Sequence, residues 1–571
     1  MSAEAGTAAG ALAADRLLEA LEQLGVELVF GLPGVHNLPL WRALSESAIR
    51  LVGVRHEQAA VYAADGYARA TGKLGVALVT TGPGAANTLG ATGEAMASGS
   101  PVLVIATDIP VRLRRPGVYR GVLHETRDQG AMFAPVTKSV GTAATAEALA
   151  GDVLAAGQLA LAAPSGPVYV GVPTDLLSVA VGDALAAAGG APSPPVPAPP
   201  PAGLDAALAL LAAARRPLIW AGGGALRADA GAAVDQLARR LAAPVVTTYM
   251  ARGLLAPDHP CAVPGPVHLP VVGALWDEAD LVIAIGSDFD GMMTQNWSMP
   301  APSRLLAINV DAVDAAKNYR PDLTLAGDAR AVTAALAERV PARDGIAQLS
   351  RRLDELGGAV RAAVEDDEPE AARLLDAMRQ TLPADAVLVL DMCIAGYWLG
   401  GFHPAPAPRT LQYPVGWGTL GFGFPAALGA AAAGRGRAVA VCGDGGFLFA
   451  CGELATAAQE RLPLTVVLVD DGGYGMLRFD QVHAGEQAFG VDLHTPDFVA
   501  LAAAFGVPAH RERGFGPGFA ARLAESLSTD GPVVIVVDAA LKPPPTTSPR
   551  WYRRRATAPP PTSTDHQEPQ P

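Results

Sequence analysis

The chain is poor in cysteine. Its 571 residues contain four, Cys261, Cys393, Cys442 and Cys451, and no two of them have the spacing of a paired metal site. This argues against a disulfide scaffold or a cysteine zinc site. We expect the four thiols to be small core residues.

Charged residues and long apolar runs are also scarce. Charged side chains make up 17% of the chain, the net charge is −14, and the basic clusters are short. A broad electropositive surface for nucleic acid is therefore not expected. No segment has about 20 apolar residues without a polar break, and the start lacks a basic stretch before an apolar run. We expect a soluble cytoplasmic protein with neither a nucleic-acid partner nor a membrane span.

Apolar residues, by contrast, form half of the chain. The length exceeds what one hydrophobic core serves, since domains usually have about 100–200 residues. Apolar strand-like runs alternate with helical segments, which is typical of parallel strands joined by crossover helices. We therefore predict an α/β fold of three doubly wound parallel-sheet domains, at residues 12–185, 203–342 and 370–545.

The predicted strands are short apolar runs, and Pro-rich segments separate or end the domains. The run APSPPVPAPPPAG (191–203) predicts an extended linker, and residues 1–11 and 546–571 predict flexible tails. The expected strands cover residues 27–30, 51–54, 76–80, 102–106 and 168–172; then 217–220, 244–248, 281–285 and 305–310; then 386–391, 438–442, 464–469 and 532–538.

Two strand ends in the third domain carry oxygen ligands. The run AVAVC ends in Gly443-Asp444-Gly445-Gly446, and LTVVLV (464–469) ends in Asp470-Asp471-Gly472-Gly473. A bare Gly-Asp-Gly is most often an ordinary turn. Neighbouring parallel strands, however, bring both ends to one crevice, where glycine backbone can approach a phosphate and carboxylates can hold a divalent cation.

This pair of strand ends resembles the motif of the thiamine-diphosphate-dependent enzymes, in which GDG is followed after some two dozen residues by an Asn pair. Here residues 446–469 form the spacer, and Asp470-Asp471 replaces the Asn pair. The resemblance implies that Mg²⁺ is held by Asp444, the side chain of Asp471 and the carbonyl of Gly473. An extra carboxylate beside a diphosphate is unfavourable unless Mg²⁺ offsets it. The remaining cofactor contacts implied here are Gly443, Gly445, Gly446, Tyr474, Gly475 and Met476.

A glycine-rich run, Gly416 to Ala426, precedes a helical segment in the same domain. Its GxGxxA pattern also fits a dinucleotide-binding loop, but that loop needs a buried apolar strand directly before the first glycine, and LQYPVGWGTL is not one. The run instead resembles GTMGFGLPAA of the thiamine-diphosphate family. The resemblance implies that Leu420 bends the cofactor into a V and that the carbonyl of Gly418 accepts a hydrogen bond from its aminopyrimidine.

In the first domain, RHEQAA (55–60) opens a helical segment, and the match continues to TTGPGAAN, ending at Asn87. Over these roughly 30 positions the chain resembles the acetolactate synthase family. The resemblance implies that Glu57 is catalytic, because a carboxylate bound to the pyrimidine ring nitrogen drives proton transfer in the cofactor. Pro33 of the FGLPG loop, Thr81 and Asn87 are the other cofactor-binding candidates.

Three residues are substrate-side candidates: His56, His124 and Asp480. His56 is equally compatible with a helix start. His124 stands where acetolactate synthases carry a Gln, and Asp480 where they carry a Trp. The run Gly34-Val35-His36 resembles some decarboxylases of basic 2-oxo acids. An acidic group near the substrate would favour a polar or cationic tail over a second carboxylate.

The middle domain is Rossmann-like. Gly222-Gly223-Gly224 and the turn Gly286 to Asp290 resemble the loops on which some relatives bind FAD, but Asp288 replaces the family's Arg. FAD is therefore possible but doubtful, and the alternative is a structural spacer.

The resemblance spans about residues 12–545 and implies pyrimidine-binding, central and diphosphate-binding domains in a homodimer or homotetramer. It implies decarboxylation of a small-molecule 2-oxo acid with carboligation, dependent on thiamine diphosphate and Mg²⁺. One alternative is a simple decarboxylase that releases an aldehyde; another is a non-catalytic nucleotide-binding or regulatory homologue. A small regulatory subunit is left open.

Overall fold

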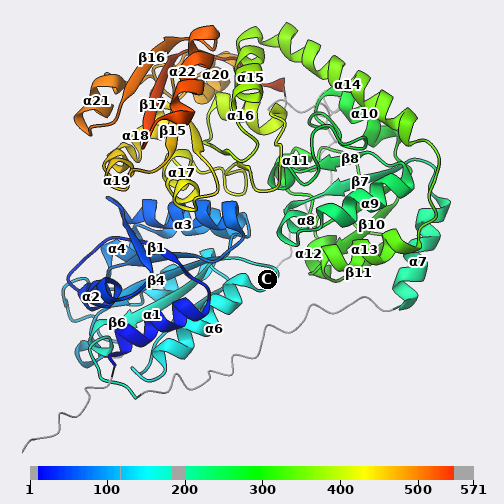
Figure 1. Cartoon of the computed structure of the whole chain (residues 1–571). Coiled ribbons are helices and arrows are strands. Elements are labelled where there is room, and N and C mark those ends of the chain that lie inside the picture. The colour runs from blue at the N-terminus through cyan, green and yellow to red at the C-terminus, as the bar shows by residue number, and fades with distance from the viewer. Residues whose placement is uncertain (1–10, 116, 183–200, 546–571) are drawn as a thin grey trace, which may run out of the picture.

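The computed structural model describes residues 11–115, 117–182 and 201–545. They form three α/β domains, shown in Figure 1, each built on one parallel sheet. The fold predicted from the sequence is thus confirmed. The predicted tails lie outside the described residues except for Ala11, as does most of the predicted linker. The last linker residues are helical, because α7 begins at Pro201, where proline is well tolerated in a helix.

The N-terminal domain has a six-stranded sheet in the order β2-β1-β3-β4-β6-β5. Its inner strands are fully buried, as expected for a parallel sheet covered on both faces. The strands are β1 (Leu28–Gly31), β2 (Arg50–Gly53), β3 (Gly75–Val79), β4 (Val102–Asp108), β5 (Ser139–Thr142) and β6 (Val168–Pro173). The α-helices are α1 (Ala13–Gln23), α2 (Leu38–Glu46), α3 (Glu57–Thr71), α4 (Pro83–Ala86), α5 (Leu89–Ala97) and α6 (Leu149–Leu161).

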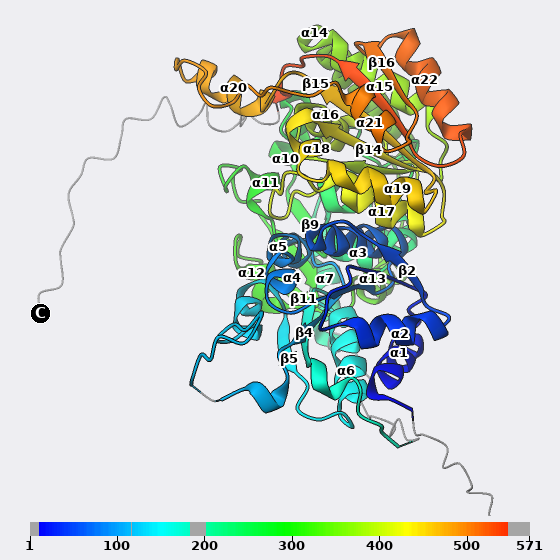
Figure 2. The ribbon, with the colours of Figure 1, turned by 90° about the vertical axis from the view of Figure 1, so that its left-hand side faces the viewer.

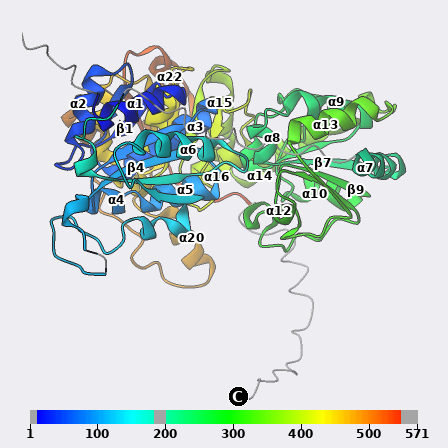
Figure 3. The ribbon, with the colours of Figure 1, turned by 90° about the horizontal axis from the view of Figure 1, so that it is seen from below.

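The central domain has a five-stranded sheet in the order β11-β10-β9-β7-β8. Figure 3 shows this domain to one side of the other two. Its strands are β7 (Pro217–Ala221), β8 (Val245–Thr247), β9 (Leu281–Ile285), β10 (Leu305–Asn309) and β11 (Leu323–Ala326). Its α-helices are α7 (Pro201–Ala213), α8 (Gly223–Arg227), α9 (Gly231–Leu241), α10 (Pro270–Glu278), α11 (Gly291–Thr294), α12 (Ala312–Ala316) and α13 (Ala329–Arg339).

The C-terminal domain has the sheet order β13-β12-β14-β15-β17-β16. Two long helices, α14 (Ile346–Asp367) and α15 (Pro369–Thr381), lead into it and are separated at Pro369, which cannot continue the α14 hydrogen bonds. The strands are β12 (Val387–Leu390), β13 (Leu411–Gln412), β14 (Ala438–Gly443), β15 (Leu464–Asp470), β16 (Ala509–Arg513) and β17 (Val533–Asp538). The other α-helices are α16 (Ile394–Phe402), α17 (Gly423–Ala432), α18 (Asp444–Leu448), α19 (Leu454–Gln459), α20 (Gly475–His483), α21 (Phe498–Ala504) and α22 (Pro517–Ser528).

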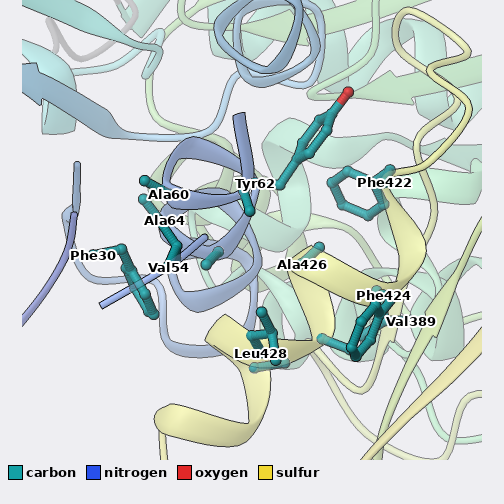
Figure 4. Packing of buried hydrophobic residues seen from close by; sticks show 14 of the residues in the cluster. Phe30, Val54, Ala60, Tyr62, Ala64, Val389, Phe422, Phe424, Ala426 and Leu428 are labelled. Carbon is teal, nitrogen blue, oxygen red and sulfur yellow. The ribbon is translucent and has the colours of Figure 1, made fainter. Parts of the chain in front are cut away.

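Helices α3 and α17 join the N-terminal and C-terminal domains, and Figure 4 shows the apolar side chains packed between them. Tyr62 of α3 meets Phe422 edge to face, with ring centroids 5.5 Å apart. The backbones come close enough to require glycine: a Cβ on Gly66 would lie 2.0 Å from the carbonyl oxygen of Ala426, and one on Gly429 would lie 1.8 Å from that of Ala63. This contact fixes how the two domains sit within one chain.

No helix among the described residues is both long enough and apolar enough to cross a membrane.

Candidate active site

The carboxyl end of β14 holds a buried carboxylate with an unused oxygen. Asp444 opens α18 and is fully buried; its Oδ1 accepts the N–H of Gly445 at 2.7 Å, whereas its Oδ2 has no hydrogen-bond partner. Burial and the nearby charge of Asp471 raise the pKa of Asp444 to about 6. A buried carboxylate oxygen without a partner is costly, and a divalent cation bound there would remove that cost.

The end of β15 supplies the second carboxylate. Burial, aided by the charge of Asp470, raises the pKa of Asp471, and Arg478 acts in the opposite direction. Asp470 is directed elsewhere, since its Oδ2 lies 3.3 Å from Nη1 of Arg511. The charge of Asp470 is therefore partly neutralised, and the Asp pair places one carboxylate, Asp471, beside Asp444.

The residues after β15 close around the GDG turn. Gly473 has φ +154°, in the region that favours glycine, and a Cβ there would lie 2.2 Å from the carbonyl oxygen of Val491. The ring of Tyr474 covers Gly445, where a Cβ would meet it at 2.6 Å. Gly475 begins α20 against the carboxylate of Asp471, and Met476 packs at the edge of the C-terminal core. The side-chain groups of Asp444 and Asp471 are thus held by tight backbone contacts.

The glycine-rich loop lies across this site. Gly418 and Gly421 have φ +73° and +84°, and Leu420 between them points to Gly446, where its Cδ1 would be 3.1 Å from an added Cβ. Asp391, directly after β12, fixes the far end of the loop by accepting the N–H groups of Gly421 at 2.9 Å and Gly423 at 3.1 Å. Burial raises the pKa of Asp391 to about 6.

In the N-terminal domain, Glu57 is the first residue of α3 and is 8% exposed. Its Oε2 accepts a hydrogen bond from Nδ2 of Asn87 at 2.9 Å. His56 is exposed and caps the same helix, since its Nδ1 accepts the N–H of Gln58 at 3.2 Å. The carboxylate of Glu57 is therefore oriented from the end of α4, while the ring of His56 is engaged in its own helix.

The turn after β3 is held by a residue that the sequence did not single out. Gln129 is buried; its Oε1 accepts the N–H of Gly82 at 2.7 Å, and its Nε2 donates to Tyr169 and to the carbonyl of Thr107. Thr81 is fully buried with its hydroxyl 3.0 Å from that of Thr107. Pro33, by contrast, lies exposed just after β1.

Four buried polar atoms without hydrogen-bond partners lie in the loops that follow β1, β3 and β4. They are Nδ1 of His36, Oγ1 of Thr80, Nδ1 of His124 and Oγ1 of Thr126. His36 and His124 meet edge to face at 5.3 Å, and His124 adopts φ +67°. Burial and the proximity of His124 lower the pKa of His36. Thr80 and Glu57 both border Gly84, and His124 borders Gly82, so Thr80 links the histidine pair to the catalytic candidate.

Asp480 lies on α20, which has no buried residue and stands away from the body of the C-terminal domain in Figure 2. Its carboxylate is exposed, and its charge acts on the buried hydroxyl of Tyr397, whose pKa is raised mainly by burial.

Not all the candidates come together within one chain. Among the described residues, no hydrogen bond or ion pair joins Glu57, His36 or His124 to Asp444 or Asp471. Nor do three or more His, Cys, Asp or Glu side chains form a metal-binding cluster in the described part of the chain. The predicted Mg²⁺ site has two such side chains, Asp444 and Asp471, and one backbone carbonyl, that of Gly473.

In the central domain the glycine loop packs directly against the loop that begins at Gly286. A Cβ on Gly222 would lie 2.3 Å from the carbonyl oxygen of Gly286, and that oxygen accepts the N–H of Gly224 at 2.9 Å. Asp288 pairs with Lys317 at 2.6 Å, and Asp290 caps α11. The backbone groups that would face a nucleotide are used in packing the two loops together.

Three family models match in chain order. They describe the N-terminal binding, central and C-terminal binding domains of thiamine pyrophosphate enzymes, and they match residues 12–132, 204–336 and 392–537. The chain belongs to the thiamine pyrophosphate enzymes.

Known members of this family are similar in sequence to this chain over most of their length. A probable 2-ketoarginine decarboxylase of Pseudomonas aeruginosa is 38% identical over 509 residues, which are 86% of this chain and 88% of that protein. A probable acetolactate synthase large subunit of Methanocaldococcus jannaschii is 31% identical, with 87% of each chain covered. The acetolactate synthase large subunit of Parasynechococcus marenigrum is 33% identical over 86% of this chain and 82% of its own.

For a thiamine pyrophosphate enzyme, the donor set at β14 and β15 fits the cofactor. The unpartnered Oδ2 of Asp444 and the neighbouring carboxylate of Asp471 suit a hard divalent cation, and the glycine turn admits a diphosphate. Asp391 was not among the residues predicted from the sequence, although it directly follows an apolar strand as Asp444 does. That recurring pattern of strand and aspartate was the signal available for it.

Proposed function

We propose that this enzyme decarboxylates a 2-oxo acid to an aldehyde and CO₂, using thiamine diphosphate and Mg²⁺, and that the acid carries a cationic tail. The observation that carries the proposal is the group of unpartnered atoms on His36, Thr80 and His124, in which Thr80 adjoins Glu57. When bound, thiamine diphosphate supplies a nucleophilic carbon and a sink for the electrons released as CO₂ leaves.

In this proposal the C-terminal domain holds the cofactor's charged end. Asp444, Asp471 and the carbonyl of Gly473 would bind Mg²⁺, which neutralises the diphosphate. The ion pair of Asp470 with Arg511 supports this assignment, because it keeps a second full charge from the phosphate oxygens. Gly418 and Leu420 would orient the aminopyrimidine.

Glu57 would hold the proton that the aminopyrimidine ring needs. Its place at the start of α3 and its hydrogen bond from Asn87 fix the direction of the carboxylate. A side chain that moves a proton within a hydrogen-bonded pair contributes about 10²–10⁴-fold to rate. A carboxylate that is 8% exposed costs folding free energy, which supports a chemical role for Glu57.

The histidine pair supports decarboxylation over carboligation. A pKa of His36 lowered by burial keeps its imidazole neutral at pH 7, so one ring nitrogen can donate and the other can accept. Aldehyde release requires a proton at the former carboxylate-bearing carbon, and the His36 ring can relay one from water, accepting it at one nitrogen as it donates from the other. Carboligation is the second candidate, because acetolactate synthases are 31% and 33% identical to the chain.

The cationic tail is proposed from charge and from similarity. Asp480 offers a carboxylate on an exposed helix, where a second substrate carboxylate would be repelled. The relative from Pseudomonas aeruginosa, by its name, acts on 2-ketoarginine. We therefore propose a guanidinium- or ammonium-bearing 2-oxo acid as substrate.

We also propose that the working form is at least a homodimer, with Glu57 of one protomer completing the cofactor site of another. The two groups of candidates lack a direct interaction within one chain. In addition, the segments that carry them expose large apolar side chains, as surfaces covered by another protomer do. These side chains are Val35, Leu38, Leu123, Trp417, Leu477 and Val482.

The test is product analysis with purified enzyme, thiamine diphosphate and Mg²⁺. The substrates are 2-ketoarginine, pyruvate, and pyruvate mixed with 2-oxobutyrate, and CO₂, aldehyde and acetohydroxy acids are all quantified. We expect CO₂ and aldehyde in equal amounts from 2-ketoarginine, with little acetohydroxy acid from the other substrates. Glu57→Gln serves as the inactive control, and sedimentation measures the oligomeric state.

Strong formation of the 2-oxobutyrate-derived acetohydroxy acid would replace this proposal with carboligation. Equal rates on pyruvate and 2-ketoarginine would contradict the proposed cationic tail of the substrate but not the proposed decarboxylation. An active monomer would remove the shared site.

A further inference from the structure

A buried carboxylate in the N-terminal domain reaches into the cofactor loop of the C-terminal domain. Glu94 of α5 is 0% exposed and accepts four hydrogen bonds. Its Oε1 receives Nη2 of Arg69 at 3.1 Å and Oγ of Ser98 at 2.8 Å. Its Oε2 receives the N–H of Trp417 and the hydroxyl of Thr419, both at 3.1 Å. One carboxylate thus divides its two oxygens between two domains.

Arg69 forms a buried ion pair with this carboxylate. Its guanidinium also forms two bonds to Asp65, at 2.8 and 2.7 Å, and one to the carbonyl of Tyr413 at 3.2 Å. The two buried carboxylates raise the pKa of Arg69 although its burial acts in the opposite direction. Charge-assisted hydrogen bonds of this kind are about twice as strong as neutral ones. The guanidinium in addition lies 4.7 Å from the ring centroid of Phe422, just beyond the loop.

Side-chain packing also holds the glycine-rich loop against the N-terminal domain. The Trp417 ring rests on α5 at Gly93, where a Cβ would lie 1.8 Å from the ring carbon Cζ3. Any larger residue at position 93 would displace the ring. The loop is therefore seated on the N-terminal domain by both its backbone and its largest side chain.

The two ends of the loop are held by different domains. Glu94 holds Trp417 and Thr419, and Asp391 of the C-terminal domain holds Gly421. Gly418 and Leu420 lie in the span between these anchors. Because Gly418 has φ +73° and Gly421 has φ +84°, the loop contains two residues with wide conformational freedom, and its shape depends on its anchors.

We infer that Glu94 is a positioning residue for the cofactor: it sets the carbonyl of Gly418 and the side chain of Leu420 from a different domain of the same chain. This inference rests on the proposed role of that loop in binding thiamine diphosphate. Helix α3 then serves two sites, since Glu57 begins it and Arg69, three turns later, braces Glu94.

The test compares Glu94→Gln and Thr419→Val with the wild-type enzyme. Gln cannot accept all four hydrogen bonds, whereas Thr419→Val removes one loop bond without leaving a buried charge unpaired. We expect the dissociation constant of thiamine diphosphate with Mg²⁺, measured by titration calorimetry, to rise about tenfold or more in Glu94→Gln and about threefold to tenfold in Thr419→Val. We also expect an altered near-ultraviolet circular dichroism of the bound cofactor and a lower turnover at saturating cofactor.

Asp290→Asn is the matched control. Its carboxylate also accepts a backbone N–H, from Met293 at 2.9 Å, but it lies in the central domain away from the loop. It should leave cofactor affinity and dichroism unchanged even if the melting temperature falls.

Wild-type affinity and dichroism in both Glu94→Gln and Thr419→Val would overturn the inference. If Glu94→Gln does not fold, an unaltered Thr419→Val overturns it alone. A wild-type protein that binds no thiamine diphosphate would instead overturn the proposed function on which the inference depends.

Discussion

The N-terminal and C-terminal domains are built alike and carry different chemistry. Their sheets have equivalent strand orders, β2-β1-β3-β4-β6-β5 and β13-β12-β14-β15-β17-β16. The helices that follow the second strand of each, α3 and α17, pack against each other through reciprocal glycine contacts. The same scaffold therefore presents two sets of strand ends and two helix starts.

The side chains at equivalent places differ in kind. β14 is followed by Asp444, whereas β3 is followed by Thr80 and Thr81. Helix α17 begins with Gly423, which donates its N–H to Asp391, whereas α3 begins with a carboxylate, Glu57. Topology thus determines where a site can form, and side-chain type determines whether it holds a cation or moves a proton.

The largest effect is expected from a substitution at the start of α3, where Glu57 lies. We expect Glu57→Gln to lower turnover by about 10²–10⁴-fold, because only proton transfer is lost. Thiamine diphosphate affinity should stay within a few-fold of wild type, because the C-terminal ligands are untouched. Steady-state turnover and calorimetric binding, measured on the same preparation, check both expectations. Turnover within a few-fold of wild type would remove Glu57 from the mechanism.

The corresponding substitution in the C-terminal domain is Asp444→Ala. It should reduce cofactor retention by about 100-fold or more, because it removes a proposed metal ligand and its unpartnered oxygen. Chelating Mg²⁺ from the wild-type enzyme with EDTA should have the same effect. Gel filtration followed by assay of bound thiamine diphosphate measures both. Full retention in Asp444→Ala would place the diphosphate elsewhere.

Much of this scaffold was predictable, and the strands that were missed share a position. The interior strands β9 (Leu281–Ile285) and β15 (Leu464–Asp470) are apolar runs that the sequence delimits to within a residue. The missed strands β5 (Ser139–Thr142), β11 (Leu323–Ala326) and β16 (Ala509–Arg513) are edge strands with polar or exposed residues. β13 (Leu411–Gln412), also missed, is an edge strand of two residues. An edge strand is covered less completely, so its sequence lacks the continuous apolar run of a parallel interior strand.

The site was predictable to the extent that chemistry appears as a local motif. Glu57, Asp444 and Asp471 stand in recognisable runs, and their individual roles remain predictions. Glu94 and Gln129 act across more than 25 residues of sequence, on Trp417 and Gly82 respectively. No spacing rule links a carboxylate in α5 to a loop 323 residues later, so only the folded chain brings them together.

The contact between the two domains can be broken at its glycines. Gly429→Ala would place a Cβ 1.8 Å from the carbonyl oxygen of Ala63, a backbone atom that cannot turn aside. We expect it to lower the free energy of unfolding by about 1–3 kcal/mol, the usual cost of overpacking. Thermal and urea unfolding measure it. Gly358→Ala in α14 is the control, since nothing lies within 4 Å of its Cβ, and it should stabilise by up to about 1 kcal/mol.

The smallest effect is expected at Asp471. Asp471→Asn keeps an oxygen ligand and removes a negative charge that, with burial, raises the pKa of Asp444. With the repulsion gone, Asp444 should remain ionised to lower pH and hold Mg²⁺ with its full charge. We therefore expect the dissociation constant of thiamine diphosphate to stay within about threefold of wild type or to decrease. Calorimetric titration at several Mg²⁺ concentrations is the measurement, with Asp444→Ala as the reference for complete loss. If Asp471→Asn loses the cofactor as fully as Asp444→Ala, the second carboxylate is required, and the two domains differ by a charged pair rather than by one ligand.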